Sequence, residues 1–182
     1  MTGDIYVVSG PSGAGKGTLL AWALPKLTNV WLSVSATTRA PRSGEHEGVQ
    51  YYFISNEEFD RLIAHDGLLE WAAVYGERYG TVRSEVEDRL TRGIDVILEI
   101  DPQGAIQVLK KMPEAILIYI DPPSLEELEK RLKGRGTEDS KTIQKRMDDS
   151  IELSKYKDRY QHVIVNDNFK TAAKELLAIL KK

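Results

Sequence analysis

The chain has 182 residues, which suits a single domain of ordinary size, and its formal net charge is −3. With 41% hydrophobic and 29% charged residues it can bury a core, and the slightly acidic balance argues against a bulk positive field for nucleic acid. No cysteine is present, which excludes disulfides and thiolate metal sites, and no apolar run approaches the ~20 residues that span a bilayer. The N-terminus lacks the basic and apolar segments of a signal peptide, so we expect a cytoplasmic protein without nucleic-acid or membrane partners.

The first predicted element is a buried strand over Ile5–Val8, which leads into a glycine-rich loop and then a helix over Leu19–Leu27. This order is the context of a phosphate-binding P-loop, in which glycines let backbone N–H groups surround a triphosphate. Lys16 is expected to reach the β- and γ-phosphates, and the positive end of the helix adds to the field. The loop residues expected to bind the triphosphate are Gly10, Pro11, Ser12, Gly13, Ala14, Gly15, Lys16, Gly17 and Thr18.

The loop departs from the pattern Gly-x-x-x-x-Gly-Lys-Ser/Thr at Gly17, where a hydroxyl is expected. Thr18 follows, and we expect its hydroxyl to contact Mg²⁺ directly or through water. A second interpretation stays open, because glycine-rich turns between strand and helix also occur in proteins that bind no nucleotide. The lysine and the two flanking elements favour the nucleotide site.

Residues 34–83 interrupt the rhythm of apolar strands and predict a small inserted α+β lobe. Strands are predicted over Tyr51–Phe53 and Leu68–Tyr75. A short helix is predicted after Ser55, where Glu58 completes a capping box.

Within this lobe, Arg39 and Arg42 lie three residues apart after a run of hydroxyl side chains, and Pro41 stiffens the turn. Guanidinium groups can bind phosphate oxygens bidentately, which lysine cannot do. The segment therefore predicts an anion clamp, with a polar surface loop as the alternative.

The alternation of strand and helix returns after residue 83. The predicted elements are a helix over Ser84–Arg92 ending near Gly93, a strand over Val96–Ile100, a helix over Gln103–Lys111 and a strand over Ile116–Ile120. Asp101 follows the first of these strands and is expected at the carboxyl edge of the sheet, where P-loop enzymes hold Mg²⁺ or its waters. The following Pro102 favours a helix N-cap role for Asp101, and the two roles can coexist.

Residues 126–156 are highly charged and contain Gly134 and Gly136, a composition that predicts a mobile helical lid. Ser124 opens the first helix, with Glu127 completing a capping box. A plain solvated helical hairpin is the alternative, since charge runs are usually solvent faces. A last strand over Val163–Val165 and a helix over Lys170–Leu180 follow.

Together these elements predict an α/β fold of the three-layer P-loop type, with a central parallel sheet, a small inserted α+β lobe and a helical lid. The expected core comprises residues 1–33, 84–125 and 157–182, the small lobe residues 34–83, and the lid residues 126–156. The histidines, which form no cluster that suggests a metal site, are expected to be surface or structural residues: His46, His65 and His162.

Six motifs, in register over almost the whole chain, resemble those of guanylate kinases. They are Gly10 to Lys16, Ser35 to Glu45, Leu69-Glu70-Trp71 with Tyr79-Gly80-Thr81, Glu99 to Gly104, Arg131 to Glu138, and Val163 to Asp167. The resemblance implies that the chain uses ATP to phosphorylate GMP, and dGMP as well. ATP would lie with Mg²⁺ on the P-loop, where Thr18 and Asp101 would hold the ion directly or through water.

On the acceptor side, the resemblance implies that Arg39 and Arg42 hold the GMP phosphate, with help from the hydroxyls of Tyr51 and Tyr79. Glu70 would accept hydrogen bonds from guanine N1–H and the 2-amino group. The other residues implied for the acceptor site are Ser35, Gly80, Thr81, Glu99 and Asp101, and Glu99 departs from the aspartate that the family often carries there. From the residues alone, Glu70 would be a solvent-facing strand residue and the two tyrosines would be packing residues.

On the donor side, Lys16 and arginines of the lid would stabilise charge on the transferring phosphoryl group, and the residues implied are Arg131, Arg135 and Arg146. Arg39, Lys16, Arg135 and Arg146 are thus the expected catalytic residues. Asn166 and Asp167 are expected near the adenine because they follow the last strand.

Two other functions are weighed against this one. Guanylate-kinase-like domains also serve as non-catalytic interaction modules, but those typically lose P-loop or lid residues that this chain retains. A P-loop kinase for another monophosphate is the second alternative, and the run from Ser35 to Glu45 together with Glu70 argues against it.

Overall fold

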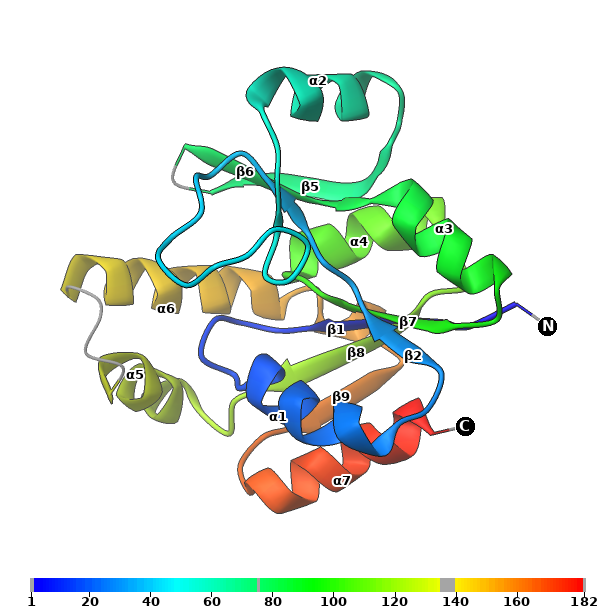
Figure 1. The fold of residues 1–182 in the computed structure, drawn as a ribbon. Helices are drawn as coiled ribbons and strands as arrows, with labels where there is room; N and C mark the ends of the chain where they lie inside the picture. Colours follow the sequence, from blue (N-terminus) through cyan, green and yellow to red (C-terminus); the bar gives the residue numbers. More distant parts are fainter. Residues whose placement is uncertain (1, 75, 135–139, 182) are drawn as a thin grey trace.

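The computed structural model describes residues 2–74, 76–134 and 140–181. Its central feature is a parallel five-stranded sheet with the order β2-β7-β1-β8-β9. The strands are β1 (Ile5–Ser9), β2 (Val30–Leu32), β7 (Asp95–Glu99), β8 (Ile116–Asp121) and β9 (His162–Val165). Because all five run parallel, their carboxyl ends meet at one edge, where the loop after β1 leads into helix α1 (Figure 1).

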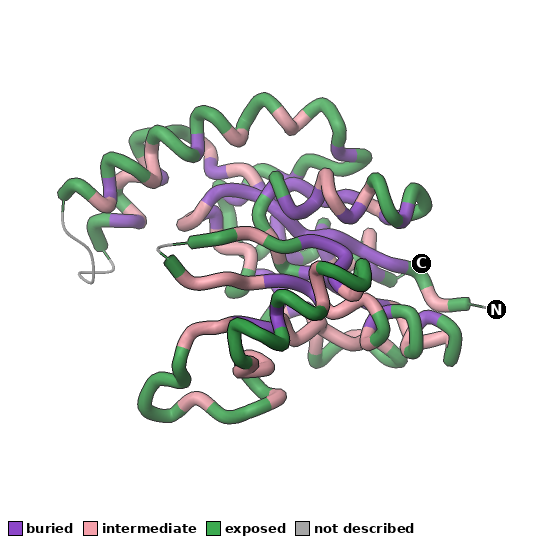
Figure 2. The backbone as a smooth tube through the Cα atoms, turned by 90° about the horizontal axis from the view of Figure 1, so that it is seen from above, coloured by how far each residue is buried: buried purple, intermediate pink, exposed green. Residues whose placement is uncertain are grey.

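The sheet is covered on both faces, as the continuous apolar runs of β1 and β8 require. Helices α1 (Lys16–Ala23) and α7 (Phe169–Leu180) pack on one face, around Val8, Leu20 and Leu176. Helices α3 (Arg83–Thr91) and α4 (Pro102–Lys111) pack on the other. The result is a three-layer core, and Figure 2 shows the buried segments concentrated in its central strands.

A second, four-stranded sheet lies above this core in Figure 1 and has the order β4-β3-β6-β5. Its strands are β3 (Ala36–Thr37), β4 (Tyr52–Phe53), β5 (Leu68–Val74) and β6 (Glu77–Val82). Helix α2 (Asn56–Ala64) begins after Ser55, whose hydroxyl accepts the Glu58 N–H at 3.1 Å. We call residues 34–83 the small lobe.

Helices α5 (Leu125–Gly134) and α6 (Ser140–Ser154) lie beside the edge of the sheet where β1 and β8 end (Figure 1). They pack on each other through Leu128, Leu132 and Ile143. Ser124 caps α5, because its hydroxyl accepts the Glu127 N–H at 3.1 Å. Short 3₁₀ turns over Leu24–Lys26 and Lys157–Arg159 complete the elements.

The predicted fold class and the predicted strands and helices of the core are confirmed, with shifts of a few residues at their ends. The sequence did not predict β2, which has three half-buried residues, or β6, whose polar run contains Arg78. Helix α1 starts earlier than predicted, at Lys16, and gives way to a 3₁₀ turn that contains Pro25. The end of the strand predicted to reach Tyr75 lies outside the described residues. No helix in the described ranges is long and apolar enough to cross a bilayer.

Candidate active site

The loop between β1 and α1 is shaped for an anion. Gly10, Gly13 and Gly15 have φ of 141°, 91° and 95°, a region that L side chains rarely adopt. A Cβ at Gly10 would also lie 2.2 Å from the carbonyl oxygen of Ile120. Gly15 is the N-cap of α1 and provides no side-chain cap, and the first turn of a helix is a common site for binding a phosphate through backbone N–H groups.

Lys16 begins α1 and turns back over the loop, where its Nζ donates to the carbonyl oxygens of Gly10 at 2.7 Å and Pro11 at 3.1 Å. Gly17 and Thr18 are exposed on the first turn of the helix. A Cβ at Gly17 would lie 3.3 Å from Oε1 of Glu99, so the Glu99 carboxylate lies beside the position where the usual hydroxyl is missing. Desolvation raises the pKa of Glu99, and the charge of Lys16 opposes that shift.

Asn166, predicted near the adenine, is bonded to the backbone of the P-loop. It is 7% exposed, and its Nδ2 donates to the carbonyl oxygen of Ala14 at 2.8 Å. The backbone carbonyl oxygen of Asn166 accepts from Nη2 of Arg131 at 2.9 Å, and Arg131 also pairs with Glu127 at 3.1 Å. Asp167 is exposed next to it. Asn166 thus joins the P-loop, the end of β9 and helix α5.

Arg146, on α6, reaches the P-loop and donates a hydrogen bond to the Ser12 hydroxyl. A cavity of about 340 Å³ lies at this junction and is lined by Gly10, Lys16, Val74, Asp101 and Arg146, among others. The P-loop, the end of β5 from the small lobe and helix α6 therefore share one cavity. Arg135 lies outside the described residues.

Arg39 is held by Glu45 in a bidentate ion pair, with both N–O distances at 2.9 Å. The hydrogen bonds to Glu45 raise the pKa of Arg39 above its usual range, and the same pair lowers the pKa of Glu45. Glu45 also accepts the backbone N–H of Arg42 at 2.7 Å, while the Arg42 residue is exposed. The sequence motif included Glu45, but its role as the partner of Arg39 was not predicted.

Aromatic side chains surround this arginine. The guanidinium of Arg39 lies 5.3 Å from the ring centre of Tyr51, and the rings of Tyr51 and Tyr79 meet edge to face at 5.7 Å. Burial raises the pKa of Tyr51. The predicted phosphate residues Arg39, Tyr51 and Tyr79 are therefore brought together by β3, β4 and β6.

Glu70 is buried, at 6% exposed, which differs from the solvent-facing position that its residue type alone suggests. Its Oε1 accepts from the hydroxyl of Thr81 at 2.7 Å, since Glu70 and Thr81 are paired on β5 and β6. Burial raises the pKa of Glu70 to about 7, and the charge of Asp101 adds to the shift. Gly80, between Tyr79 and Thr81 on β6, is paired with Ala36 on β3. Ser35 directly precedes Ala36 in the chain.

Asp101 caps helix α4, because its Oδ1 accepts the N–H of Gly104 at 2.8 Å, so the predicted N-cap role is confirmed. Its side chain is exposed and lines both the P-loop cavity and a neighbouring cavity of about 290 Å³ between β5 and α6. An acid at the carboxyl edge of the sheet can therefore also face a nucleotide or its cation.

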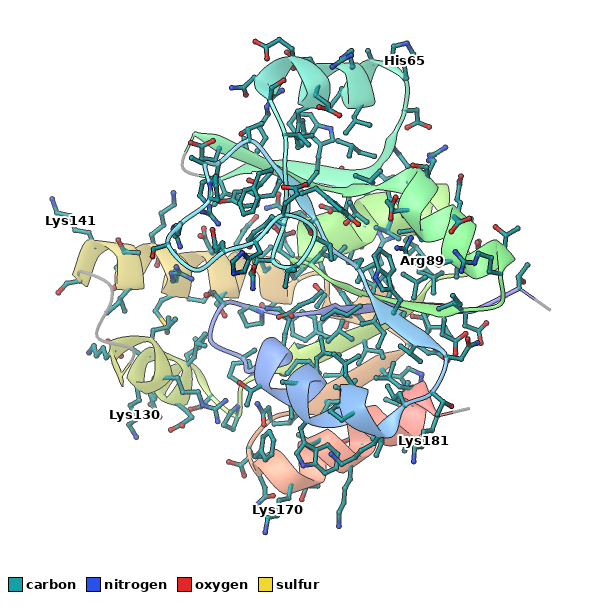
Figure 3. All side chains as sticks on the ribbon, viewed as in Figure 1. His65, Arg89, Lys130, Lys141, Lys170 and Lys181 are labelled. Carbon is teal, nitrogen blue, oxygen red and sulfur yellow. The ribbon has the colours of Figure 1, made fainter. Side chains whose placement is uncertain are left out.

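One histidine, His65, lies apart from this site. Figure 3 places His65 at the end of α2, remote from the P-loop, where its Nδ1 lies 2.8 Å from the carbonyl oxygen of Arg61. His46 and His162 are exposed. Within residues 2–74, 76–134 and 140–181, no group of three or more His, Asp or Glu side chains is arranged to hold a metal ion.

The sequence and the fold were compared with known proteins. The family model described as guanylate kinase matches residues 2–182. The chain is 50% identical to a guanylate kinase of Fusobacterium nucleatum over 179 residues, covering 98% of this chain and 96% of that protein. It is 52% identical to one of a Synechococcus species over 170 residues, covering 93% and 90%. A crystal structure of guanylate kinase from Anaplasma phagocytophilum superposes with a TM-score of 0.75 at 36% identity, covering 98% of this chain and 85% of that one. The chain therefore belongs to the guanylate kinase family.

Proposed function

We propose the following arrangement of the two nucleotides for the transfer of the γ-phosphoryl group from ATP to GMP by this guanylate kinase. ATP lies on the P-loop, with its phosphates against the first-turn N–H groups of α1 and against Lys16. GMP lies in the small lobe, with its phosphate on Arg39 and Arg42 and the hydroxyls of Tyr51 and Tyr79. The observation that carries the proposal is the presence of two cationic groups, Lys16 at the P-loop and Arg39 in the small lobe, where Glu45 holds it. The P-loop cavity also reaches Val74 at the end of β5, so the small lobe borders the donor side.

In the transfer, an oxygen of the GMP phosphate forms a bond to the γ-phosphorus in line with the bond that breaks. The bridging oxygen leaves with ADP, and GDP is the second product. No general base is required, because the attacking phosphate is already largely ionised near neutral pH. The protein supplies alignment and charge neutralisation, for which Lys16, Arg39 and the lid residues Arg135 and Arg146 are the proposed catalytic groups.

We propose that Mg²⁺ binds on the donor side of the site. The hydroxyl of Thr18 and the carboxylate of Asp101 are oxygen ligands of the kind that Mg²⁺ prefers, and both residues are exposed at the P-loop edge. We propose that they hold the ion that accompanies ATP, directly or through water. When bound, the ion would neutralise charge on the phosphates. Asn166, Asp167 and Arg131 are proposed to border the rest of ATP.

Selection of the base rests on Glu70. One carboxylate matches two adjacent donors of guanine, N1–H and the 2-amino group, whereas adenine presents an acceptor at N1. A buried carboxylate left without these donors is costly, which rejects the wrong base. Ser35, Gly80 and Thr81 complete the proposed base pocket, with Glu99 and Asp101 at its edge toward the metal. None of these roles involves the sugar 2′-hydroxyl, so the proposal extends to dGMP.

Residues 126–156 are proposed to act as a lid that closes over ATP and shuts out water. The contact of Arg146 with Ser12 supports this, because it joins α6 to the P-loop. With residues 34–83 as the acceptor lobe and the remainder as the core, the three parts form one catalytic domain. We place the enzyme in the cytoplasm, where its substrates ATP and GMP are made and used.

The test is an ADP-release assay with GMP, dGMP, AMP, CMP and UMP as acceptors. We expect ADP release with GMP and dGMP only, and a loss of about 10²-fold or more in Lys16→Ala with folding retained. Lys26→Ala is the control, because that lysine lies beyond the end of α1, where its Nζ contacts the carbonyl oxygen and the ring of Trp22. Unchanged turnover in Lys16→Ala would remove the P-loop from the mechanism. No acceptor-dependent ADP release at all would favour a non-catalytic interaction module.

A further inference from the structure

Strand β5 lies at the edge of the small lobe's sheet, with β6 on one side and helix α4 of the core packed against it. The side-chain amide of Gln107 makes both contacts that a neighbouring strand would make. Its Oε1 accepts the N–H of Trp71 at 3.2 Å, and its Nε2 donates to the carbonyl oxygen of Trp71 at 3.1 Å. Trp71 follows Glu70 directly, so the peptide group next to the proposed base-reading residue is held by α4.

Two further contacts fix the same strand. Lys111, one turn beyond Gln107, donates from Nζ to the carbonyl oxygen of Leu68 at 2.6 Å. Leu69 is fully buried in the core cluster that also contains Val108. The residues on either side of Glu70 are therefore both attached to α4 or to the core beneath it.

The carboxylate of Glu70 is itself in close contact with the same helix. A Cβ built on Gly104 would lie 2.8 Å from Oε2 of Glu70, so this helix approaches the carboxylate as closely as a glycine allows. Gly104, Gln107 and Lys111 are spaced by three and four residues and so share one face of α4. The first residue before that helix is Asp101, at the P-loop cavity. One helix thus spans the donor edge and the base pocket.

From this arrangement we propose that Gln107 is a positioning residue for acceptor selection. By holding both peptide groups of Trp71, it fixes where the Glu70 carboxylate meets the base, relative to the P-loop cavity that Asp101 lines at the start of α4. The inference rests on the proposed role of Glu70 in reading guanine. In this proposal Gln107 acts through the backbone of Trp71, to which both atoms of its amide are bonded.

Gln107→Met is the variant that tests it, because methionine has a similar shape but neither donates nor accepts at these positions. We expect KM for GMP to rise about tenfold, the loss expected when two neutral hydrogen bonds no longer fix the pocket. We expect selectivity for GMP over IMP, which lacks the 2-amino group, to fall by a similar factor. KM for ATP should stay within about twofold, and kcat at saturating GMP should fall less than kcat/KM.

The chain offers a matched control in Gln161→Met. The Gln161 amide makes the same two kinds of contact at the start of the core strand β8, accepting from Leu117 N–H at 2.8 Å and donating to the carbonyl oxygen of Ala115, just before the strand, at 3.4 Å. This variant should lower stability by a comparable amount without a change in KM for GMP. Gln107→Glu keeps the acceptor and loses the donor, and it should give an intermediate rise even if Gln107→Met folds poorly.

A folded Gln107→Met or Gln107→Glu enzyme with unchanged KM for GMP and unchanged selectivity would overturn the proposal. So would an equal rise in KM for GMP in Gln161→Met, because that would mark a general loosening. Glu70→Gln, measured in parallel, distinguishes a failure of the proposed role of Glu70 from a failure of the proposed role of Gln107. If Glu70→Gln keeps its selectivity, the base is read elsewhere and the positioning role of Gln107 falls with it, whereas failure of Gln107→Met alone leaves the function of Glu70 intact.

Discussion

The hydroxyl of Thr81 donates a hydrogen bond of 2.7 Å to Oε1 of Glu70, and both residues are buried on paired strands of the small lobe. A buried carboxylate is costly unless it is well paired, and here burial raises the pKa of Glu70 to about 7. The cost is compatible with a role in binding, because two donors of a guanine base would satisfy the group when the acceptor arrives.

Replacing Glu70 by glutamine tests that role. Glu70→Gln keeps the shape but presents an amide to guanine, so one of the two base hydrogen bonds becomes a clash between donors. We expect kcat/KM for GMP to fall about 10²-fold while KM for ATP is unchanged. Steady-state kinetics with GMP, IMP and AMP measures this, and Glu114→Gln in the exposed turn between α4 and β8 serves as the control. Retained preference for GMP would exclude Glu70 as the base-reading residue.

The same carboxyl group makes stability depend on pH. Between pH 4.5 and about 7 the folded protein keeps the Glu70 proton while the unfolded chain releases it, so the contribution of Glu70 falls as pH rises through this window. The loss is on the order of 3 kcal/mol above pH 7, and Glu70→Gln removes it. Urea unfolding of both proteins without nucleotide, at pH 5 and pH 8, should show the wild type losing stability relative to the variant. A difference that stays constant with pH would show that the Glu70 carboxyl keeps its ordinary pKa.

Much of the fold could be predicted because its signals are local. Ile5–Val8 reads as a buried strand from its own side chains, and the glycines that follow need positive φ, as Gly10 and Gly13 have. The cap formed by Asp101 was visible in the Pro102 that follows it. Strand β2 was missed because three half-buried residues carry no periodicity, and its partner β7 lies more than sixty residues away.

The site was harder to predict from the sequence, because its key contacts join residues that are far apart in the chain. Asn166 contacts Ala14 across 152 positions, and only its place after the last strand drew attention to it. Gln107 looks like any polar residue on a surface helix until β5 is seen to lie against it. Glu70 follows two leucines on a strand, and its burial depends on Gly104 of another element. The family resemblance pointed to Glu70 as a site residue. Why Glu70 is buried could be understood only from the fold.

The ion pair of Arg39 and Glu45 gives a third expectation. Glu45 holds the guanidinium bidentately and also fixes the backbone at Arg42, so Glu45→Ala should leave the phosphate clamp disordered before GMP binds. We expect KM for GMP to rise about tenfold, with a smaller change in kcat, because binding must then order the side chain and its loop. Isothermal titration with GMP gives the affinity directly.

Asp60→Ala is the control for this change, since it breaks the pair of Asp60 and Arg78 on the same lobe at an exposed position. That variant should bind GMP normally. Tighter binding of GMP by Glu45→Ala would contradict the expectation and show that Glu45 competes with the phosphate for Arg39.

Asn166 should act on the opposite nucleotide. Asn166→Ala removes the hydrogen bond to the Ala14 carbonyl oxygen and leaves that buried group without it, so the P-loop loses its support from β9. We expect KM for ATP to rise about tenfold while KM for GMP stays within about twofold, the reverse of the pattern expected for Gln107→Met. Asn168→Ala, two residues on, is matched to it: Asn168 caps α7 by accepting the Thr171 N–H at 3.1 Å, and its loss should cost about 1 kcal/mol of stability without affecting KM for ATP. If both asparagine variants raise KM for ATP alike, the effect comes from a loosened core, and Asn166 does not specifically support the P-loop.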